Sequence, residues 1–227
     1  MLLPSYQMFP EAGGAVAPSA GGLLTSFSTS FLATENPISE GGIWLNGLAD
    51  GVDWNNIETA NGNAFGTEFQ PGTFDDNIAI LKNWGLTDYY VFGIVHRGAG
   101  YNPSINHEVE LFGRGKRTLG TPNLWRGYEI LMSAHGNSEI VRWNGAVGSF
   151  QSIAQVGDQA VQDDDEILAV FSGPSITVFR NDIEINSATD ATFADGAPGI
   201  GTFSGGGGSP AVVLANLGLK YFECGPL

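Results

Sequence analysis

The sequence contains little cysteine and few basic residues. Cys224 is the one cysteine in 227 residues, so no disulfide within the chain can stabilise the fold. We interpret it as a free thiol, with a bridge to a second chain as the alternative. Nine Lys and Arg stand against 24 Asp and Glu, a formal charge of −15. This balance argues against nucleic acid and anionic membrane surfaces as partners, and leaves neutral glycans, cations and basic protein surfaces open.

Long hydrophobic runs are also missing. No stretch approaches the roughly 20 apolar residues of a membrane-spanning helix. The first residues lack the basic region and continuous apolar core of a secretory signal. We therefore expect a protein that is cytoplasmic when synthesised and reaches a virion or an extracellular surface by cell lysis. A signal removed before Met1 was added is the alternative. Three scattered His and one Cys form no zinc pattern.

Glycine and proline are abundant and separate short apolar runs. The 33 Gly and 11 Pro punctuate about thirteen runs of β-branched and aromatic residues, with no long helix pattern and no repeat of fixed period. Asn61-Gly62 is a strong hairpin signal. Residues 88–97 are apolar on both faces, which predicts a strand central in its sheet. The spacing predicts one all-β sandwich.

Residues 165–203 carry the clearest strand pattern. Apolar runs at Ile167–Phe171, Ile176–Phe179 and Ile200–Phe203 are separated by turn residues at 172–174 and 180–182. We expect these three runs to form an antiparallel meander.

Two segments resemble a known group of folds. The 165–203 pattern, ending in DGAPGIGTF, resembles the second half of concanavalin A-like jelly rolls, which include laminin G-like domains, legume-type lectins and polysaccharide-acting enzymes. ATENPISEGGIWLNG (33–47) resembles the opening of small jelly-roll modules of bacterial and phage proteins, where a tryptophan, here Trp44, anchors the first strands. The resemblance implies a two-sheet antiparallel jelly-roll sandwich whose last strand, 211–223, pairs with the first. It also implies a site on a concave sheet, without specifying an activity.

Residues 1–25 differ from the rest in composition. They are rich in Gly, Ala and Pro and carry one charge, Glu11. We expect an extended N-terminal arm followed by a jelly-roll domain over 26–227. Its apolar residues could pack on a neighbouring subunit or on the same domain; these are Leu2, Leu3, Tyr6, Met8 and Phe9.

Glu108 and Glu110 are the candidate catalytic residues. Residues two apart on a strand share a face, which would bring the two carboxyls together. The pair resembles part of the E-x-D-x-E strand of retaining glucanases, with Phe112 in place of the third acid. Tyr128 is the candidate base if the protein resembles lyases of this fold, although their other motifs are missing. We favour a structural alternative, in which Glu108, Glu110, Glu129 and Arg126 form ion pairs on a solvated face.

Tryptophans beside polar residues are candidate glycan contacts, because flat aromatic rings and hydrogen-bonding side chains together bind sugars. The alternative is that the aromatic rings fill the core. The candidates are Trp125, Arg126, Glu129, Arg142, Trp143, Asn144 and His96.

Calcium is the one cofactor that the sequence raises. Asp163, Asp164 and Asp165 offer carboxylate ligands, although their spacing is not that of an EF-hand loop. A solvated acidic turn at a strand end is the alternative.

The sequence thus favours a non-catalytic surface or assembly module. We expect a phage-type virion component (decoration, cement or tail-associated) that binds other subunits through its arm and contacts a glycan. The alternatives are a stand-alone carbohydrate-binding module, and a glycosidase or lyase that uses Glu108 and Glu110.

Overall fold

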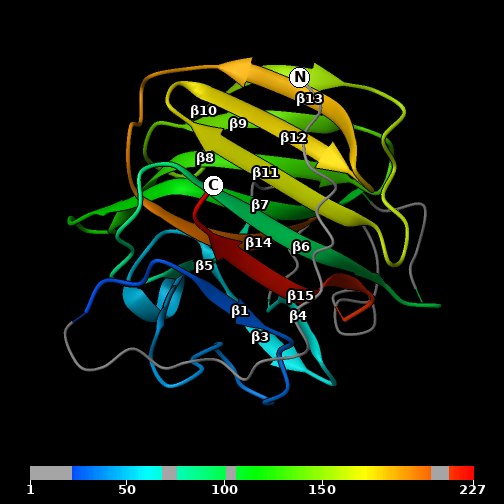
Figure 1. Ribbon diagram of the computed structural model, residues 1–227. Coiled ribbons are helices and arrows are strands. Elements are labelled where there is room, and N and C mark those ends of the chain that lie inside the picture. Colours follow the sequence, from blue (N-terminus) through cyan, green and yellow to red (C-terminus); the bar gives the residue numbers. More distant parts are fainter. Residues whose placement is uncertain (1–21, 68–75, 101–105, 206–214) are drawn as a thin grey trace.

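The protein is built from β-strands. The computed structural model describes residues 22–67, 76–100, 106–205 and 215–227, which form fifteen strands and one short 3-10 helix, η1 (Leu48–Asp50) (Figure 1). No helix within these ranges is long and apolar enough to cross a membrane. The predicted arm residues Leu2, Leu3, Tyr6, Met8 and Phe9 lie outside the described residues.

The strands form two stacked layers, which we name after their central strands. In the β7 sheet the order is β10-β9-β8-β7-β14-β5, with β2 beside β5. Its strands are β2 (Trp44–Asn46), β5 (Asn77–Leu81), β7 (Asn106–Thr118), β8 (Leu124–Ser133), β9 (Ser138–Trp143), β10 (Phe150–Val156) and β14 (Ala197–Gly205).

In the β6 sheet the order is β13-β12-β11-β6-β15, with β1 and β4 beside β15. Strand β3 (Asn55–Ala60) pairs with β4 and with β5, and so joins the two layers. The remaining strands are β1 (Phe27–Thr29), β4 (Asn63–Gly66), β6 (Tyr89–Arg97), β11 (Glu166–Ser172), β12 (Ser175–Arg180), β13 (Ile183–Thr189) and β15 (Leu217–Gly225).

Two tight hairpins form where the sequence predicts them. Asn61 and Gly62, with φ of 54° and 76°, connect β3 to β4. Asn181 and Asp182, with φ of 50° and 65°, connect β12 to β13. Left-handed φ at both central positions gives a turn whose twist matches that of the strands, and Asn, Asp and Gly tolerate this conformation best.

The expected three-run meander is wrong in its third member. The runs at 167–171 and 176–179 form the β11–β12 hairpin, but Ile200–Phe203 lies in β14 and pairs with β5 and β7 in the other sheet. The meander's third strand is β13, a weakly apolar segment with exposed Ile183. An apolar run indicates a strand, but the sheet that the strand joins depends on distant partners.

The first and last strands meet as expected. Phe27 of β1 pairs in register with Cys224 of β15, and the Trp44 ring packs 5.6 Å from Phe27 and 5.5 Å from Phe222 between ring centroids. The Trp44 indole donates a hydrogen bond to Glu40 Oε2. Trp44 therefore anchors both ends of the domain. Cys224 is fully buried, which corrects the alternative of a bridge to a second chain.

The main core fills the space between the two sheets. Val109 and Leu111 of β7 belong to it, as do Val91 and Val95 of β6. At Gly113 the sheets approach so closely that a Cβ atom would collide with the ring of Phe171 from the opposite layer. Glycine is required there by packing, and its backbone φ is not in the left-handed region.

Replacing Gly113 with alanine should therefore destabilise the fold. Overpacking a dense core typically costs about 1–3 kcal/mol, and we expect a loss of that size in the free energy of unfolding. Gly157→Ala is the matched control, because a Cβ atom at Gly157 meets nothing within 4 Å. Urea unfolding of both variants measures the difference. Equal stability of the two variants would contradict this close approach of the sheets.

Candidate functional site

The outer face of the β7 sheet, which points away from the β6 sheet, carries the charged candidates. Along β7, Val109 and Leu111 face the core, whereas Glu108, Glu110 and Phe112 alternate onto the outer face. Glu108 and Glu110 therefore share a face.

Four aromatic rings cover the middle of this outer face. We call Trp54, Phe112, Trp125 and Trp143 the aromatic cluster; each ring is 3% exposed or less. The Trp54 centroid lies 4.5 Å from Trp143, 5.5 Å from Trp125 and 5.8 Å from Phe112, in edge-to-face geometry. The cluster is a second, smaller core on the side of the sheet that commonly faces solvent.

Trp54 reaches this position because its segment is attached to two neighbouring loops. Val52 forms a bridge with Asn123, and the Asn123 side chain donates to the Asp50 carbonyl at 2.9 Å. The Asp53 carboxylate accepts a hydrogen bond from the Val147 backbone at 2.9 Å. These bonds hold residues 50–54 across the ends of β7, β8 and β9.

Three buried carboxyls lie on one side of the aromatic cluster. We call Asp76, Glu110 and Glu129 the carboxyl row; they are 5%, 0% and 3% exposed. Glu110 pairs in register with Gly201, where a Cβ atom would collide with the Glu110 carboxyl and the Phe112 ring. The Trp143 indole donates to Glu129. Neither carboxyl oxygen of Glu110 has a hydrogen-bond partner among the described residues.

Burial controls the protonation of these carboxyls. Desolvation raises the pKa of Glu110 well above its usual range, and the neighbouring charges of Glu129, Asp76 and Glu108 raise it further. The pKa of Glu129 is also raised, first by burial and then by Asp76. Burial raises the pKa of Glu108 to about 7. Glu110 is therefore held neutral, because a charge there would be buried without compensation.

This geometry corrects the sequence-based interpretation of the acidic pair. Glu110 and Glu129 are buried and form no ion pair with Arg126, so the solvated face of cross-strand ion pairs is wrong. Tyr128 belongs to the core between the sheets, on the opposite face of the β7 sheet from Glu110, and its hydroxyl donates to Asp190 Oδ1 at 2.7 Å. It cannot act as a base beside Glu108 and Glu110.

The predicted glycan contacts do not converge on one surface. Trp125 and Trp143 are buried in the aromatic cluster, so they are not glycan contacts and the alternative that these rings fill a core is correct; Glu129 is buried beside them. Arg142 donates to Thr192 and Gln151 and pairs with Asp190. The other three candidates are separated: Arg126 is exposed on β8, Asn144 is exposed after β9, and His96 lies on β6 in the other sheet.

The three aspartates proposed for calcium bind protein groups. Asp163 pairs with Lys220 and accepts a hydrogen bond from the Arg97 backbone at 2.8 Å, and Asp164 also pairs with Lys220. Buried Asp165 accepts from the Gln162 backbone and from the Asn181 side chain. No cluster of three or more His, Cys, Asp or Glu within the described ranges is arranged to hold a metal ion. These aspartates therefore stabilise the turn before β11.

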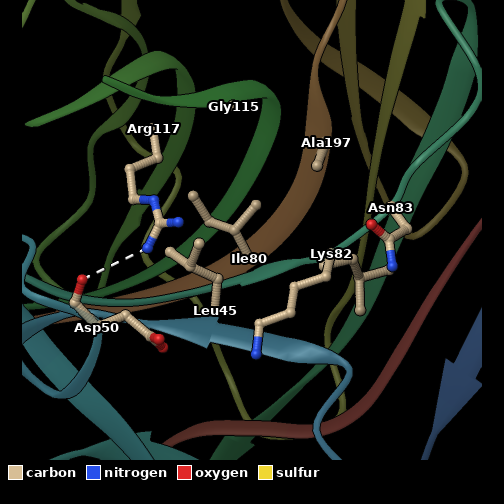
Figure 2. Close-up of a pocket in the computed structure, with 9 residues that line it drawn as sticks. Leu45, Asp50, Ile80, Lys82, Asn83, Gly115, Arg117 and Ala197 are labelled. Atoms are coloured by element: carbon tan, nitrogen blue, oxygen red, sulfur yellow. Dashed lines mark hydrogen bonds between the residues drawn. The ribbon is translucent and has the colours of Figure 1, made fainter. Parts of the chain in front are cut away.

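A surface pocket opens on the other side of the aromatic cluster. We call it the terminal pocket, because it lies at the end of the aromatic cluster (Figure 2). It has a volume of about 450 Å³ and lies where β2, β5, β7 and β14 meet. Apolar side chains, including Leu45 and Ile80, form part of its wall, and polar and charged groups surround them. Its lining residues are Leu45, Asp50, Ile80, Leu81, Lys82, Asn83, Gly115, Arg117 and Ala197.

Local backbone structure positions the polar groups of the terminal pocket. Asn83 has a left-handed φ of 57°, and its carbonyl accepts a hydrogen bond from Leu24 at 2.7 Å, which holds the chain at the end of β5. The Asp50 carboxylate accepts from the Asn46 backbone at 2.7 Å. Sequence reasoning missed the pocket, because its walls come from four separated segments. The one available signal was Asn83, a residue type that tolerates left-handed φ, two positions after the end of an apolar run.

Comparison with known proteins shows structural neighbours only. No family model matches the chain, and no curated protein matches it in sequence. The carbohydrate-binding module CBM66 from Bacillus subtilis aligns with a TM-score of 0.53 and 13% identity over 80% of this chain and 98% of its own. The calcium-bound exoplasmic/lumenal domain of VIP36 aligns with a TM-score of 0.57 and 10% identity, covering 89% of this chain and 90% of its own.

An enzyme is among the solved neighbours. A prokaryotic β-1,3-1,4-glucanase (lichenase) derived from a mouse hindgut metagenome aligns with a TM-score of 0.52 and 13% identity over 90% of this chain and all of its own. The chain has a concanavalin A-like jelly-roll fold. The two-sheet jelly roll predicted from the sequence is confirmed. At these identities the likeness shows the fold alone, because one fold hosts binding and catalytic proteins alike.

The buried carboxyl of Glu110 should make the free energy of unfolding depend on pH. Burial raises the pKa of Glu110 in the folded protein, so the folded protein keeps the proton on Glu110 at a pH where the unfolded chain has lost it. In the unfolded chain this loss occurs above about pH 4.3. The contribution of Glu110 to stability is therefore complete below that pH and is lost as pH rises towards the folded pKa. Glu110→Gln, which is neutral in both states, should gain relative to wild type by about 1.4 kcal/mol per pH unit in this window.

Urea unfolding of wild type and Glu110→Gln at several pH values between about 4 and 8 measures this slope. Glu184→Gln, on the exposed part of β13, is the control and should follow wild type. A stability difference between Glu110→Gln and wild type that does not change with pH would show that Glu110 ionises as freely in the folded protein as in the unfolded chain.

Proposed function

We propose that the protein is a non-catalytic surface module that binds a glycan in the terminal pocket. The single observation that carries this proposal is the pocket itself, whose lining combines the polar side chains of Asp50, Asn83 and Arg117 with the apolar side chains of Leu45 and Ile80. Sugar rings present apolar C–H faces and polar hydroxyl edges, so a site with apolar walls and a polar rim suits them. The solved neighbours include carbohydrate-binding proteins, which supports this class of ligand.

The burial of the carboxyl row supports binding without catalysis. A retaining glycosidase needs one carboxyl that attacks the sugar and a second that protonates the leaving group, both in contact with substrate. Glu110 and Glu129 are 0% and 3% exposed, and the aromatic cluster covers the sheet beside them. Glu108 is half-buried, and its carboxylate accepts a hydrogen bond from Asn106 at 3.0 Å. A sugar that reaches Glu108 therefore has no access to Glu110 or Glu129 as the second carboxyl.

A place on the surface of a phage-type virion is the finer part of the proposal. Its support comes from the sequence: the acidic composition, the single cysteine and the Gly-, Ala- and Pro-rich segment 1–25. In this role the arm would bind neighbouring subunits, and the terminal pocket would bind a glycan at the outer surface.

Glycan binding should depend on the rim of the terminal pocket. Asn83→Gly removes one side-chain amide, and glycine keeps the left-handed backbone at this position. Loss of one neutral hydrogen bond should weaken binding of the best ligand on a glycan array about three- to tenfold. Isothermal titration calorimetry measures the change, and Asn144→Ala, an exposed amide after β9, is the control.

Two results would contradict this function. Binding that Asn144→Ala weakens as much as Asn83→Gly would locate the site away from the terminal pocket. Hydrolysis of the bound glycan by wild type, abolished in Glu110→Gln, would show that the carboxyl row is catalytic.

The arm generates a separate prediction. Multi-angle light scattering of the full chain should give a mass above that of one copy. A chain lacking residues 1–21, which keeps the buried Leu24 and its hydrogen bonds to Asn83 and Gly85, should be a monomer. A monomeric full chain would remove the assembly role and leave the glycan-binding role intact.

A further inference from the structure

Two cationic side chains line the terminal pocket. Lys82 follows β5 and Arg117 lies near the end of β7, and Figure 2 shows them on either side of Leu45 and Ile80. The Lys82 ammonium donates to the Gly42 carbonyl at 3.1 Å, and Arg117 donates to the Asp50 carbonyl at 3.5 Å. Each cation is thus held by a backbone oxygen, which leaves its other N–H donors available to a ligand.

Neither cation is neutralised by a carboxylate. No ion pair of Lys82 or Arg117 occurs within the described ranges. Arg114, Lys116, Arg142 and Lys220 each have an aspartate partner, whereas Arg126 and Arg180, like the two pocket cations, have none there. With 24 acidic residues for nine basic ones, carboxylate partners are in excess. Two unpaired cations in one pocket of such a chain therefore indicate a site for a negative group on a ligand.

The rest of the pocket suits a sugar ring that carries this group. Asp50 is the one acidic lining residue, so two cations and one anion leave the lining with a charge of +1. The Asp50 carboxylate and the Asn83 amide can bind hydroxyl groups, and Leu45 and Ile80 can contact the C–H face of a ring. Gly115 and Ala197, which are small, leave space between these groups.

We propose that the terminal pocket recognises an acidic saccharide, whose carboxylate binds between Lys82 and Arg117 and whose hydroxyls bind Asp50 and Asn83. This inference rests on the proposed glycan-binding function and names its substrate class. Arg is suited to the role because its planar fork donates two parallel hydrogen bonds to a carboxylate.

The net charge of −15 does not oppose this assignment for a single acidic sugar. At about 0.1 M salt, charges more than roughly 10 Å apart are largely screened, so the groups lining the pocket determine the potential that a bound ligand meets. A polyanion, which extends over the acidic surface, remains a poor ligand. The expectation of a neutral glycan came from the total charge, which averages over the surface and does not describe this pocket.

Isothermal titration calorimetry on the full chain tests the inference. The probes are glucuronate, galacturonate and N-acetylneuraminate, with glucose and galactose as neutral counterparts and acetate as a carboxylate without a sugar. We expect at least one acidic sugar to bind about tenfold or more tightly than the neutral sugars and acetate, because hydrogen bonds to charged groups are stronger than neutral ones.

Three variants locate the binding. Lys82→Gln and Arg117→Gln should each weaken binding of the acidic sugar about tenfold or more and leave a neutral sugar unaffected. Arg126→Gln is the matched control: it removes the same charge from the adjacent strand, where Arg126 pairs in register with Lys116, whereas Arg117 pairs with Trp125. Circular dichroism and thermal melting check that each variant is folded.

Four other results would each contradict a specific part of the proposal. Neutral sugars that bind as tightly as acidic ones would refute the role of the two cations and leave the proposed function standing. Acetate that binds as tightly as the acidic sugars would refute recognition of the saccharide. Equal weakening by Arg126→Gln would show a general charge effect. Absence of binding to every sugar, together with a blank glycan array, would refute the proposed function itself.

Discussion

The packing of Trp54 against Phe112, Trp125 and Trp143 organises the outer face of the β7 sheet. The edge-to-face contacts bring residues 50–54 over the sheet and exclude water from its middle. On one side the dry face encloses three carboxyls, which are costly to ionise without water. On the other side, where the cluster ends, the terminal pocket remains open. The aromatic cluster thus separates the buried carboxyl row from the accessible terminal pocket.

The burial of the carboxyl row gives Glu108-Val109-Glu110 a different chemistry from the one that its resemblance to the glucanase motif implies. Glu108-Val109-Glu110 has the spacing of two acids on one strand face, and the structure does bring Glu108 and Glu110 onto one face. Reactivity depends on solvent and substrate access as well as on spacing. The Glu110 carboxyl packs against Gly201, and its oxygens have no hydrogen-bond donor among the described residues. Such a carboxyl contributes to stability in a pH-dependent way, without contact with a substrate.

The charge of the terminal pocket differs from the net charge of the whole chain. The total of −15 is a sum over the whole chain and does not give the positions of its nine basic residues. Arg114 and Arg142 are used internally to hold Asp88 and Asp190, whereas Lys82 and Arg117 line the terminal pocket without an acidic partner in the described chain. Recognition depends on the charges within about a Debye length of the ligand, and composition does not report their positions.

Local rules explain the part of the fold that was predictable. Turn residues with left-handed φ at Asn61-Gly62 and Asn181-Asp182 and the alternation along the strands act within a few residues, so the sequence pattern alone predicted them. The anchoring role of Trp44, which packs against the distant Phe222, was implied by the resemblance to jelly-roll modules. The sheet membership of Ile200–Phe203, the burial of Trp125 and Trp143, and the assembly of the terminal pocket were decided only in the folded chain. Each of these features depends on partners tens of residues away. The sequence around an indole ring or a carboxyl does not indicate whether a distant segment will bury it.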